Sequence, residues 1–213
     1  MTPGAPYIAV AGNIGAGKSS FLDFVTSRFD VEPVYEPNED NPFLAPFYAD
    51  MTRWAFHSQV FFLAAKQQIH DGLTHATGPI IQDRTIWEDA EIFAEQLYRT
   101  GKLSPDEYAT YRRLYESTLD RIRPPDVLIY LRCPVRTLTR RIARRGRDME
   151  RGIPTAYLRA LHDLYEAWFD RWTLSPKLVI QTDRIDPVTD LLAHTEVLDL
   201  MGQYLQRRPP GSP

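Results

Sequence analysis

The glycine-rich segment GNIGAGKS, at residues 12–19, constrains this chain more than any other feature of its sequence. It fits the pattern G-x-x-x-x-G-K-[ST] in full, in which glycines let backbone N–H groups converge on phosphate oxygens. The apolar run YIAVA before it predicts a buried strand, and the residues after it predict a helix whose N-terminus attracts anions. This context favours a phosphate-binding loop over a plain glycine-rich turn.

The predicted loop also indicates its ligands. Lys18 would reach the β- and γ-phosphates, and Ser19 would bind magnesium, so we expect ATP or another nucleoside triphosphate together with Mg²⁺. The residues expected to contact the triphosphate are Gly12, Asn13, Ile14, Gly15, Ala16, Gly17, Lys18, Ser19 and Ser20. The motif alone does not separate kinases from GTPases or motor ATPases.

Further short apolar runs lack polar alternation, as is typical of parallel strands covered on both faces. The expected strands are residues 7–11, 33–36, 79–82, 126–131 and 178–181. Helical patterns occupy residues 18–28, 54–74, 87–100, 105–121, 134–145, 154–172 and 187–206. This alternation predicts an α/β chain with the P-loop NTPase fold: an open parallel sheet of about five strands, covered by helices, with an arginine-rich helical lid.

Length, charge and cysteine content limit the classes of protein. The 213 residues suit a single domain over residues 1–206, with a lid near 140–152 and a disordered tail at 207–213. A net charge of −3 gives no overall reason to expect nucleic acid or an anionic membrane as partner. The single cysteine fits a reducing compartment, and no segment approaches ~20 apolar residues, so we expect a cytoplasmic protein.

Charged residues follow two of the predicted strands. Glu36 ends the second strand, and Asp83 and Arg84 end the third. Because the carboxyl ends of parallel strands meet at the ligand-binding edge, we expect all three beside the phosphate loop. Glu36 would accept the proton of an acceptor hydroxyl, Asp83 would complete the magnesium shell, and Arg84 would neutralise the transferring phosphoryl group. The alternatives are a solvated glutamate and an ion pair that caps the next helix.

The segment RTLTRRIARRGRDMERGIP, residues 136–154, is the most basic part of the chain. Its arginines are spaced four apart in two adjacent helical rows, Arg140 with Arg144 and Arg141 with Arg145. Gly146 is expected to end this helix, and Arg147 extends the basic patch. Since like charges at this spacing repel, a bound polyanion is expected, and the phosphate loop favours a triphosphate over nucleic acid.

Together these motifs resemble the deoxyribonucleoside kinase family, in the branch that holds bacterial deoxyadenosine, deoxyguanosine and deoxycytidine kinases. The resemblance covers roughly residues 7–172 and rests on GNIGAGKSS, the Glu-Pro pair, the DRT triplet and RGRDMERGIP, in the family's order. It implies transfer of the terminal phosphate of ATP to the 5′-hydroxyl of a deoxynucleoside. The stretch NEDNPFL looks closer to purine-type members, which implies deoxyadenosine first, deoxyguanosine second and deoxycytidine as a further acceptor.

The resemblance also implies roles for individual residues. Glu36 resembles the general base and Arg84 the arginine that contacts the 5′ oxygen; Lys18, Arg141 and Arg145 join them as catalytic positions. The implied substrate-binding residues are Glu36, Tyr48, Gln59, Arg84, Asp89, Phe93 and Glu150. Tyr48 and Glu150 match the pair on the sugar 3′-hydroxyl, Gln59 and Asp89 match residues near the base, and Phe93 matches a stacking aromatic. Arg141, Arg145 and Arg147 match the lid arginines that bind the triphosphate.

Two positions depart from the family's pattern, and other functions remain in competition. Lys66 stands where the family usually has arginine, a difference that bears on contacts with the base, and Ser58 stands where bulkier residues are common. A nucleoside monophosphate kinase of the thymidylate kinase type is the nearest alternative, followed by a non-enzymatic GTP-binding switch, although no N-K-x-D motif is present. The family is commonly dimeric, so the resemblance implies a homodimer.

Overall fold

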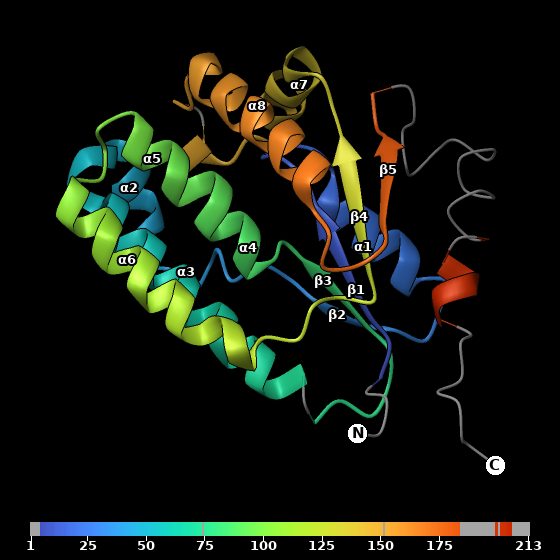
Figure 1. Cartoon of the computed structure of the whole chain (residues 1–213). Helices are drawn as coiled ribbons and strands as arrows, with labels where there is room; N and C mark the ends of the chain where they lie inside the picture. Colours follow the sequence, from blue (N-terminus) through green and yellow to red (C-terminus); the bar gives the residue numbers. More distant parts are fainter. Residues whose placement is uncertain (1–4, 74, 151, 184–198, 200, 206–213) are drawn as a thin grey trace.

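The fold is an open sheet of five parallel strands in the order β2-β3-β1-β4-β5 (Figure 1). The computed structural model describes residues 5–73, 75–150, 152–183, 199 and 201–205. The strands are β1 (Tyr7–Ala11), β2 (Glu32–Val34), β3 (Ile80–Asp83), β4 (Val127–Arg132) and β5 (Lys177–Gln181). The predicted five-stranded parallel sheet is therefore confirmed, and the strand that leads into the glycine-rich loop lies at its centre.

Helices connect the strands in chain order. They are α1 (Lys18–Thr26), α2 (Leu44–Ala49), α3 (Met51–Leu73), α4 (Ile86–Glu88), α5 (Glu95–Arg99), α6 (Pro105–Thr118), α7 (Val135–Arg145) and α8 (Thr155–Arg171). A π-helical segment, η1 (Asp89–Ala94), joins α4 to α5, and two 3₁₀ turns are η2 (Leu119–Arg121) and η3 (Asp148–Glu150). Residues 201–205 are also helical.

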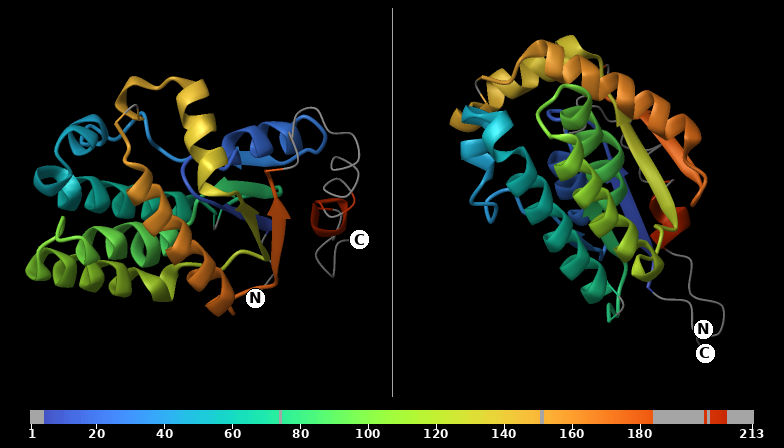
Figure 2. Two further views of the ribbon diagram at one scale, coloured as in Figure 1. Left: turned by 90° about the horizontal axis from the view of Figure 1, so that it is seen from above. Right: turned by 60° about the vertical axis from the view of Figure 1, so that its left-hand side comes forward.

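The two faces of the sheet bury different apolar clusters. The larger cluster joins alternate residues of β1 and β4, such as Ala9 and Tyr130, to side chains of α3, η1, α6 and α8. The smaller cluster joins the opposite faces, such as Ile8 and Ile129, to α1 and Met201. Figures 1 and 2 show α3, α6 and α8 on one side of the sheet and α1 on the other. Both faces are thus covered, which explains why the strands read as continuous apolar runs.

Local signals begin and end several helices. At α4, Thr85 and Glu88 form a reciprocal capping box, and Ser104 and Glu107 form a second one at α6. Gly146 ends α7 in a left-handed conformation, with φ of 70°, as predicted. These caps satisfy backbone groups that helix ends leave without partners.

Some predicted boundaries are wrong. The second strand ends at Val34, so Glu36 lies in the loop beyond it, where Pro37 holds the backbone out of the sheet. No separate sequence signal predicted α2 or the π-helical segment inside the predicted helix at 87–100. Most of the predicted helix at 187–206, and the predicted tail at 207–213, lie outside the described residues.

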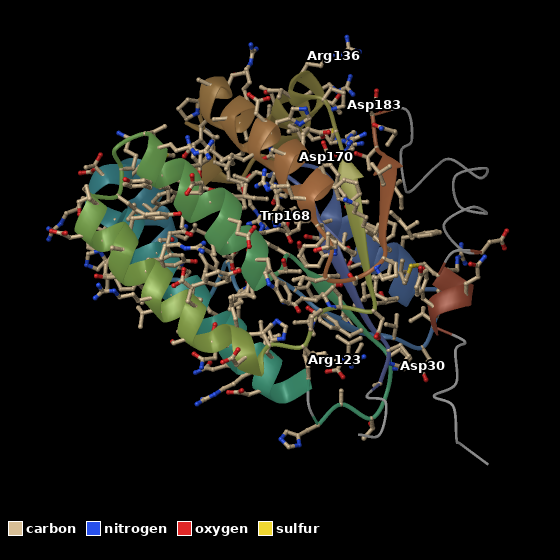
Figure 3. All side chains as sticks on the ribbon, viewed as in Figure 1. Asp30, Arg123, Arg136, Trp168, Asp170 and Asp183 are labelled. Atoms are coloured by element: carbon tan, nitrogen blue, oxygen red, sulfur yellow. The ribbon has the colours of Figure 1, made fainter. Side chains whose placement is uncertain are left out.

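The carboxyl ends of all five strands meet at one edge of the sheet. Figure 3 shows Arg136 of α7 and Asp183, just after β5, at this edge, and Asp30 and Arg123 at the opposite edge. The glycine-rich loop, Glu36 and Arg84 all follow strands and so belong to the same edge. In the described part of the chain, no helix combines the length and apolar character that crossing a membrane requires.

Candidate active site

The glycine-rich loop has the backbone shape that a phosphate cradle needs. Gly15 and Gly17 have positive φ angles of 80° and 101°, a region that side chains rarely enter. A Cβ on Gly15 would lie 2.9 Å from Cγ1 of Ile142, so the loop packs tightly against α7. Gly17 is the N-cap of α1, and Lys18 is its first residue. The backbone N–H groups of the loop and the N-terminus of α1 therefore converge on one place.

Lys18, Ser19 and Asp83 form a compact polar group next to this loop. The Lys18 ammonium donates to the carbonyl of Gly12 at 2.9 Å and lies 3.7 Å from Oδ1 of Asp83. The Ser19 hydroxyl donates to Oδ2 of Asp83 at 3.3 Å. Burial and then the Arg84 cation lower the pKa of Lys18, while Asp83 acts against them. Opposite charge keeps the ammonium beside the loop, where a phosphate would replace backbone carbonyls as its partner.

This group fits a magnesium ion. Asp83 Oδ1 is buried and has no hydrogen-bond partner among the described residues. Hydroxyl and carboxylate oxygens suit Mg²⁺, which commonly takes one or two protein ligands and completes its shell with water and phosphate oxygens. Ser19 and Asp83 supply such a pair, and their role as magnesium ligands stays a prediction.

Glu36 lies between two buried cations. Its Oε2 is 2.7 Å from an NH1 nitrogen of Arg84, and its Oε1 is 3.7 Å from the Lys66 ammonium. The Glu36 side chain is only 4% exposed, which rejects the alternative of a solvated loop residue. Burial alone would raise the pKa of Glu36, but Arg84 and Lys66 outweigh it and hold that pKa below its usual value. Glu36 is therefore a carboxylate at neutral pH.

Arg84 is held in an unusual backbone conformation. Its φ is 61°, the only positive φ of a non-glycine residue in the described chain, and such conformations cost of order 1 kcal/mol or more. The Arg84 carbonyl accepts from Lys66 Nζ at 2.6 Å and from Gln82 Nε2 at 3.0 Å. The Arg84 N–H donates to Val10 of the central strand. These contacts offset the strain and aim the guanidinium at Glu36.

Lys66 accordingly has a role that its sequence position did not reveal. We expected this residue to concern base recognition, since it departs from the family's usual arginine. Instead, its fully buried ammonium donates to the carbonyls of Asp83 and Arg84 and pairs with Glu36. Its long stem crosses from α3 to the end of β3. Only the packing of α3 against the sheet brings these groups together.

Tyr48 and Glu150 are neighbours although far apart in sequence. Tyr48 lies on α2 and Glu150 on η3. Burial, followed by the Glu150 carboxylate, raises the pKa of the Tyr48 hydroxyl. The half-buried Tyr48 hydroxyl therefore lies within electrostatic range of the buried Glu150 carboxylate, and a role of the two residues on a sugar hydroxyl stays a prediction.

Three further predicted substrate residues are buried on α3 and η1. Phe93 stacks under Arg84, whose Cζ lies 4.2 Å from the ring centroid. Asp89 is buried in η1, and its pKa is raised to about 7, chiefly by burial. Gln59 is buried on α3. Asp89 Oδ2 and Gln59 Oε1 have no hydrogen-bond partner within the described residues, so both are acceptors that lack a donor.

An open cavity of about 880 Å³ connects part of this arrangement to solvent. Ser19, Glu36, Asp83 and Arg147 are among the residues that line it, so the magnesium pair and the predicted base share one space. Tyr48, Gln59, Asp89 and Phe93 are not among its lining residues. Of these four residues, Phe93 lies against Arg84, the ion-pair partner of Glu36.

The arginines of α7 do not share one environment. Arg141 donates to the carbonyl of Ala16 at 3.0 Å and to the Thr182 hydroxyl at 3.2 Å, so it bridges the phosphate loop to the end of β5. Arg145 donates to Oε2 of Glu150, and Arg147 lies 3.7 Å from Oε1 of the same residue. Arg140 and Arg144 are exposed. The triphosphate-binding roles of Arg141, Arg145 and Arg147 stay predictions.

The chain matches the family model described as deoxynucleoside kinase over residues 8–205. It is 34% identical over 202 residues to a deoxyadenosine/deoxycytidine kinase of Bacillus subtilis (strain 168), covering 93% of this chain and 92% of the relative. It is 36% identical over 166 residues to a deoxyguanosine kinase of the same organism, covering 76% of this chain and 77% of that relative.

Two structures of deoxyadenosine kinase from M. mycoides, each 28% identical in sequence, match 92% of this chain and 98% of their own chains. One, with products dCMP and dCDP bound, gives a TM-score of 0.82, and the other, with bound dATP, gives 0.79.

Proposed function

Because this chain belongs to the deoxynucleoside kinase family, and is thus an enzyme that transfers phosphate to a hydroxyl, we propose its substrates and the roles of its residues. It transfers the terminal phosphate of ATP to the 5′-hydroxyl of a deoxynucleoside, with deoxyadenosine preferred, deoxyguanosine second and deoxycytidine as a further acceptor. The observation that carries the proposal is the buried Glu36–Arg84 ion pair, whose carboxylate residue, Glu36, lines the same cavity as Ser19 and Asp83. Membership of the family sets aside the monophosphate kinase and the GTP-binding switch.

In this proposal the phosphate loop binds the donor. Backbone N–H groups of residues 12–19 hold the phosphates, and Lys18 follows the charge on the terminal phosphate. Ser19 and Asp83 would hold Mg²⁺, which would supply positive charge beside the phosphates. Preorganised donors of this kind stabilise the charge that develops in the transition state.

Glu36 orients the acceptor hydroxyl. Its low pKa makes it a weak base, so it accepts a hydrogen bond from the 5′-hydroxyl first and takes the proton late. Arg84, whose guanidinium pairs with this carboxylate, contacts the 5′ oxygen and the phosphoryl group. Tyr48 and Glu150 bind the 3′-hydroxyl, which fixes the sugar so that the 5′-hydroxyl faces the donor.

The base preference follows from the two acceptors that lack donors. Gln59 Oε1 and Asp89 Oδ2 are buried, and an exocyclic amino group such as that of adenine or cytosine supplies the missing donor. A guanine presents a carbonyl there and requires a donor, which Asp89 provides only when protonated. Phe93 supports the base by stacking. The names of the relatives, which include deoxyadenosine/deoxycytidine and deoxyguanosine kinases, agree with this range of acceptors.

The lid and the homodimer belong to the proposal as well. Residues 140–152 close over the triphosphate within a single domain of residues 1–206, which predicts protection of this segment from hydrogen exchange when ATP and an unreactive acceptor are bound. Tyr98 and Leu114 are large apolar side chains exposed on α5 and α6, which supports an interface there. Light scattering on the purified protein measures the mass directly.

A phosphorylation panel tests the proposed function. Each of the four deoxynucleosides, and the corresponding monophosphates, is offered with ATP or GTP in the presence and absence of Mg²⁺. We expect product from deoxyadenosine with ATP and Mg²⁺, less from deoxyguanosine, and none from a monophosphate acceptor. Preferential phosphorylation of thymidine, or of any monophosphate, would contradict the proposal.

A further inference from the structure

Glu88 is a fully buried carboxylate that none of the roles above uses. Its Oε1 accepts from the backbone N–H of Gly12 at 3.2 Å and from the Tyr165 hydroxyl at 2.9 Å. Its Oε2 accepts from the N–H of Thr85 at 2.8 Å and from the Thr85 hydroxyl at 3.1 Å. One side chain therefore connects the first residue of the phosphate loop, the residue after Arg84, and α8.

These contacts exceed what a helix cap requires. A capping box uses one carboxylate oxygen, here Oε2, and leaves the other free to face solvent. Burying a carboxylate is costly, and burial indeed raises the pKa of Glu88. Four donors offset that cost, and two of them reach Oε1 from parts of the chain that lie outside the cap.

We propose that Glu88 is a positioning residue that fixes the entry of the phosphate loop relative to Arg84. Gly12 begins the loop on the donor side, and Thr85 continues from Arg84 on the acceptor side. By binding both N–H groups, Glu88 holds the terminal phosphate and the 5′-hydroxyl in line. The inference rests on the roles proposed for the phosphate loop and Arg84, and Glu88 acts only through them.

The chain contains a matched control for the capping role. Ser104 and Glu107 form a capping box on the exposed start of α6, with distances equal to those at Thr85 and Glu88. The N-cap N–H to carboxylate distance is 2.8 Å in both boxes, and the return bond to the N-cap hydroxyl is 3.3 Å in both. Among the described residues, Glu107 forms no hydrogen bond or ion pair with the site, so Glu107→Gln changes a capping residue alone.

The experiment compares Glu88→Gln, Glu107→Gln and Tyr165→Phe in steady-state kinetics, with rates normalised to active sites titrated by ATP binding. A carboxamide has one oxygen and one NH₂ group, so Glu88→Gln cannot accept from Gly12 and Thr85 together. We expect its kcat to fall roughly 10- to 100-fold, because small misplacements of reacting groups have effects of this size. The KM for each substrate should stay within about threefold. Tyr165→Phe should show a smaller fall in kcat, and Glu107→Gln none.

Two outcomes overturn the inference. One is a kcat for Glu88→Gln equal to that of Glu107→Gln, which reduces Glu88 to a helix cap. The other, decisive if Glu88→Gln does not fold, is an unchanged kcat for Tyr165→Phe. Lys18→Ala, measured in the same panel, separates a failure of this inference from a failure of the proposed function. If Lys18→Ala retains normal turnover, the proposed roles of the loop fail as well. If Lys18→Ala is inactive and Glu88→Gln is normal, only the role of Glu88 fails.

Discussion

The donor side and the acceptor side of this site consist of different kinds of chemical group. The donor side is one continuous segment, residues 12–19, whose backbone N–H groups and positive-φ glycines create the binding surface. The acceptor side consists of single side chains from α2, α3, the ends of β2 and β3, η1 and η3. The donor side therefore depends on local backbone conformation, whereas the acceptor side depends on how distant elements pack. Substitutions should therefore act differently on the two.

Lys18→Ala should have the largest effect, because Lys18 is the donor side's one essential side-chain charge. The alanine leaves the glycine backbone intact but removes the ammonium that stabilises the terminal phosphate in the transition state. We expect kcat to fall roughly 10³-fold with little change in thermal stability, the upper end for loss of one preorganised donor. Circular dichroism and turnover on the same sample check this. Near-normal turnover would mean that the loop binds something other than the transferred phosphate.

Glu36→Gln is the corresponding test of the acceptor side. The amide keeps the shape but loses the charge that pairs with Arg84 and orients the hydroxyl. We expect kcat to fall at least ~100-fold while deoxynucleoside binding weakens far less. Calorimetry beside steady-state kinetics separates the two quantities. If kcat stays within a few-fold of the unaltered enzyme, Glu36 is not the base, and Glu39 and Asp40 in the same loop become the next candidates.

Removing the sugar 3′-hydroxyl probes Tyr48 and Glu150 without altering the protein. A 2′,3′-dideoxynucleoside leaves this buried pair without its partner, which costs ~1–3 kcal/mol. We therefore expect kcat/KM to fall by roughly one to two orders of magnitude. If the Tyr48→Phe variant loses as much kcat/KM on removal of the 3′-hydroxyl as the unaltered enzyme does, the tyrosine hydroxyl contributes nothing. If the unaltered enzyme uses the deoxynucleoside and the dideoxynucleoside with equal efficiency, Tyr48 and Glu150 are not part of the site.

Lys66→Met and Lys66→Arg test whether the acceptor side depends on the buried ammonium of Lys66. Methionine keeps the stem but loses the hydrogen bonds to the Asp83 and Arg84 carbonyls, so the strained Arg84 backbone relaxes and kcat should fall roughly tenfold. Arginine retains the charge and should preserve more activity, although a planar guanidinium does not replace an ammonium fully. A methionine variant with unchanged kcat would show that the Arg84 conformation holds without Lys66.

Asp89 should make the base preference depend on pH, which is the smallest of these effects. Its pKa is raised to about 7 by burial, so it is mostly protonated at pH 6 and mostly ionised at pH 8. Only the protonated acid donates to the guanine carbonyl, so the kcat/KM ratio of deoxyguanosine to deoxyadenosine should rise a few-fold as pH falls. Asp89→Asn, which carries a donor at every pH, should flatten this dependence. A ratio that is constant across this range in the unaltered enzyme would remove Asp89 from base recognition.

The sequence allowed a fuller prediction of the donor side than of the acceptor side. The strand, the loop, the start of α1 and the end of α7 at Gly146 follow from local signals, and all are confirmed. Resemblance to the family supplied Tyr48, Gln59 and Asp89, whose roles in this chain stay predictions. The positive φ of Arg84 and the buried contacts of Lys66 and Glu88 depend on tertiary packing, which no local pattern encodes.

The central position of β1 has a consequence for how the chain acquires its structure. β1 precedes the other four strands of the sheet in the chain, yet its partners come much later: Tyr7 lies opposite Ile80, and Ile8 lies opposite Val127. Pairings between residues so far apart in sequence require long loops to close and slow the folding of parallel sheets. During synthesis the phosphate loop therefore emerges early but has no sheet to hold it until β4 has left the ribosome. Until then the apolar face of β1 is exposed to aggregation, which makes this strand the segment most in need of protection by a chaperone.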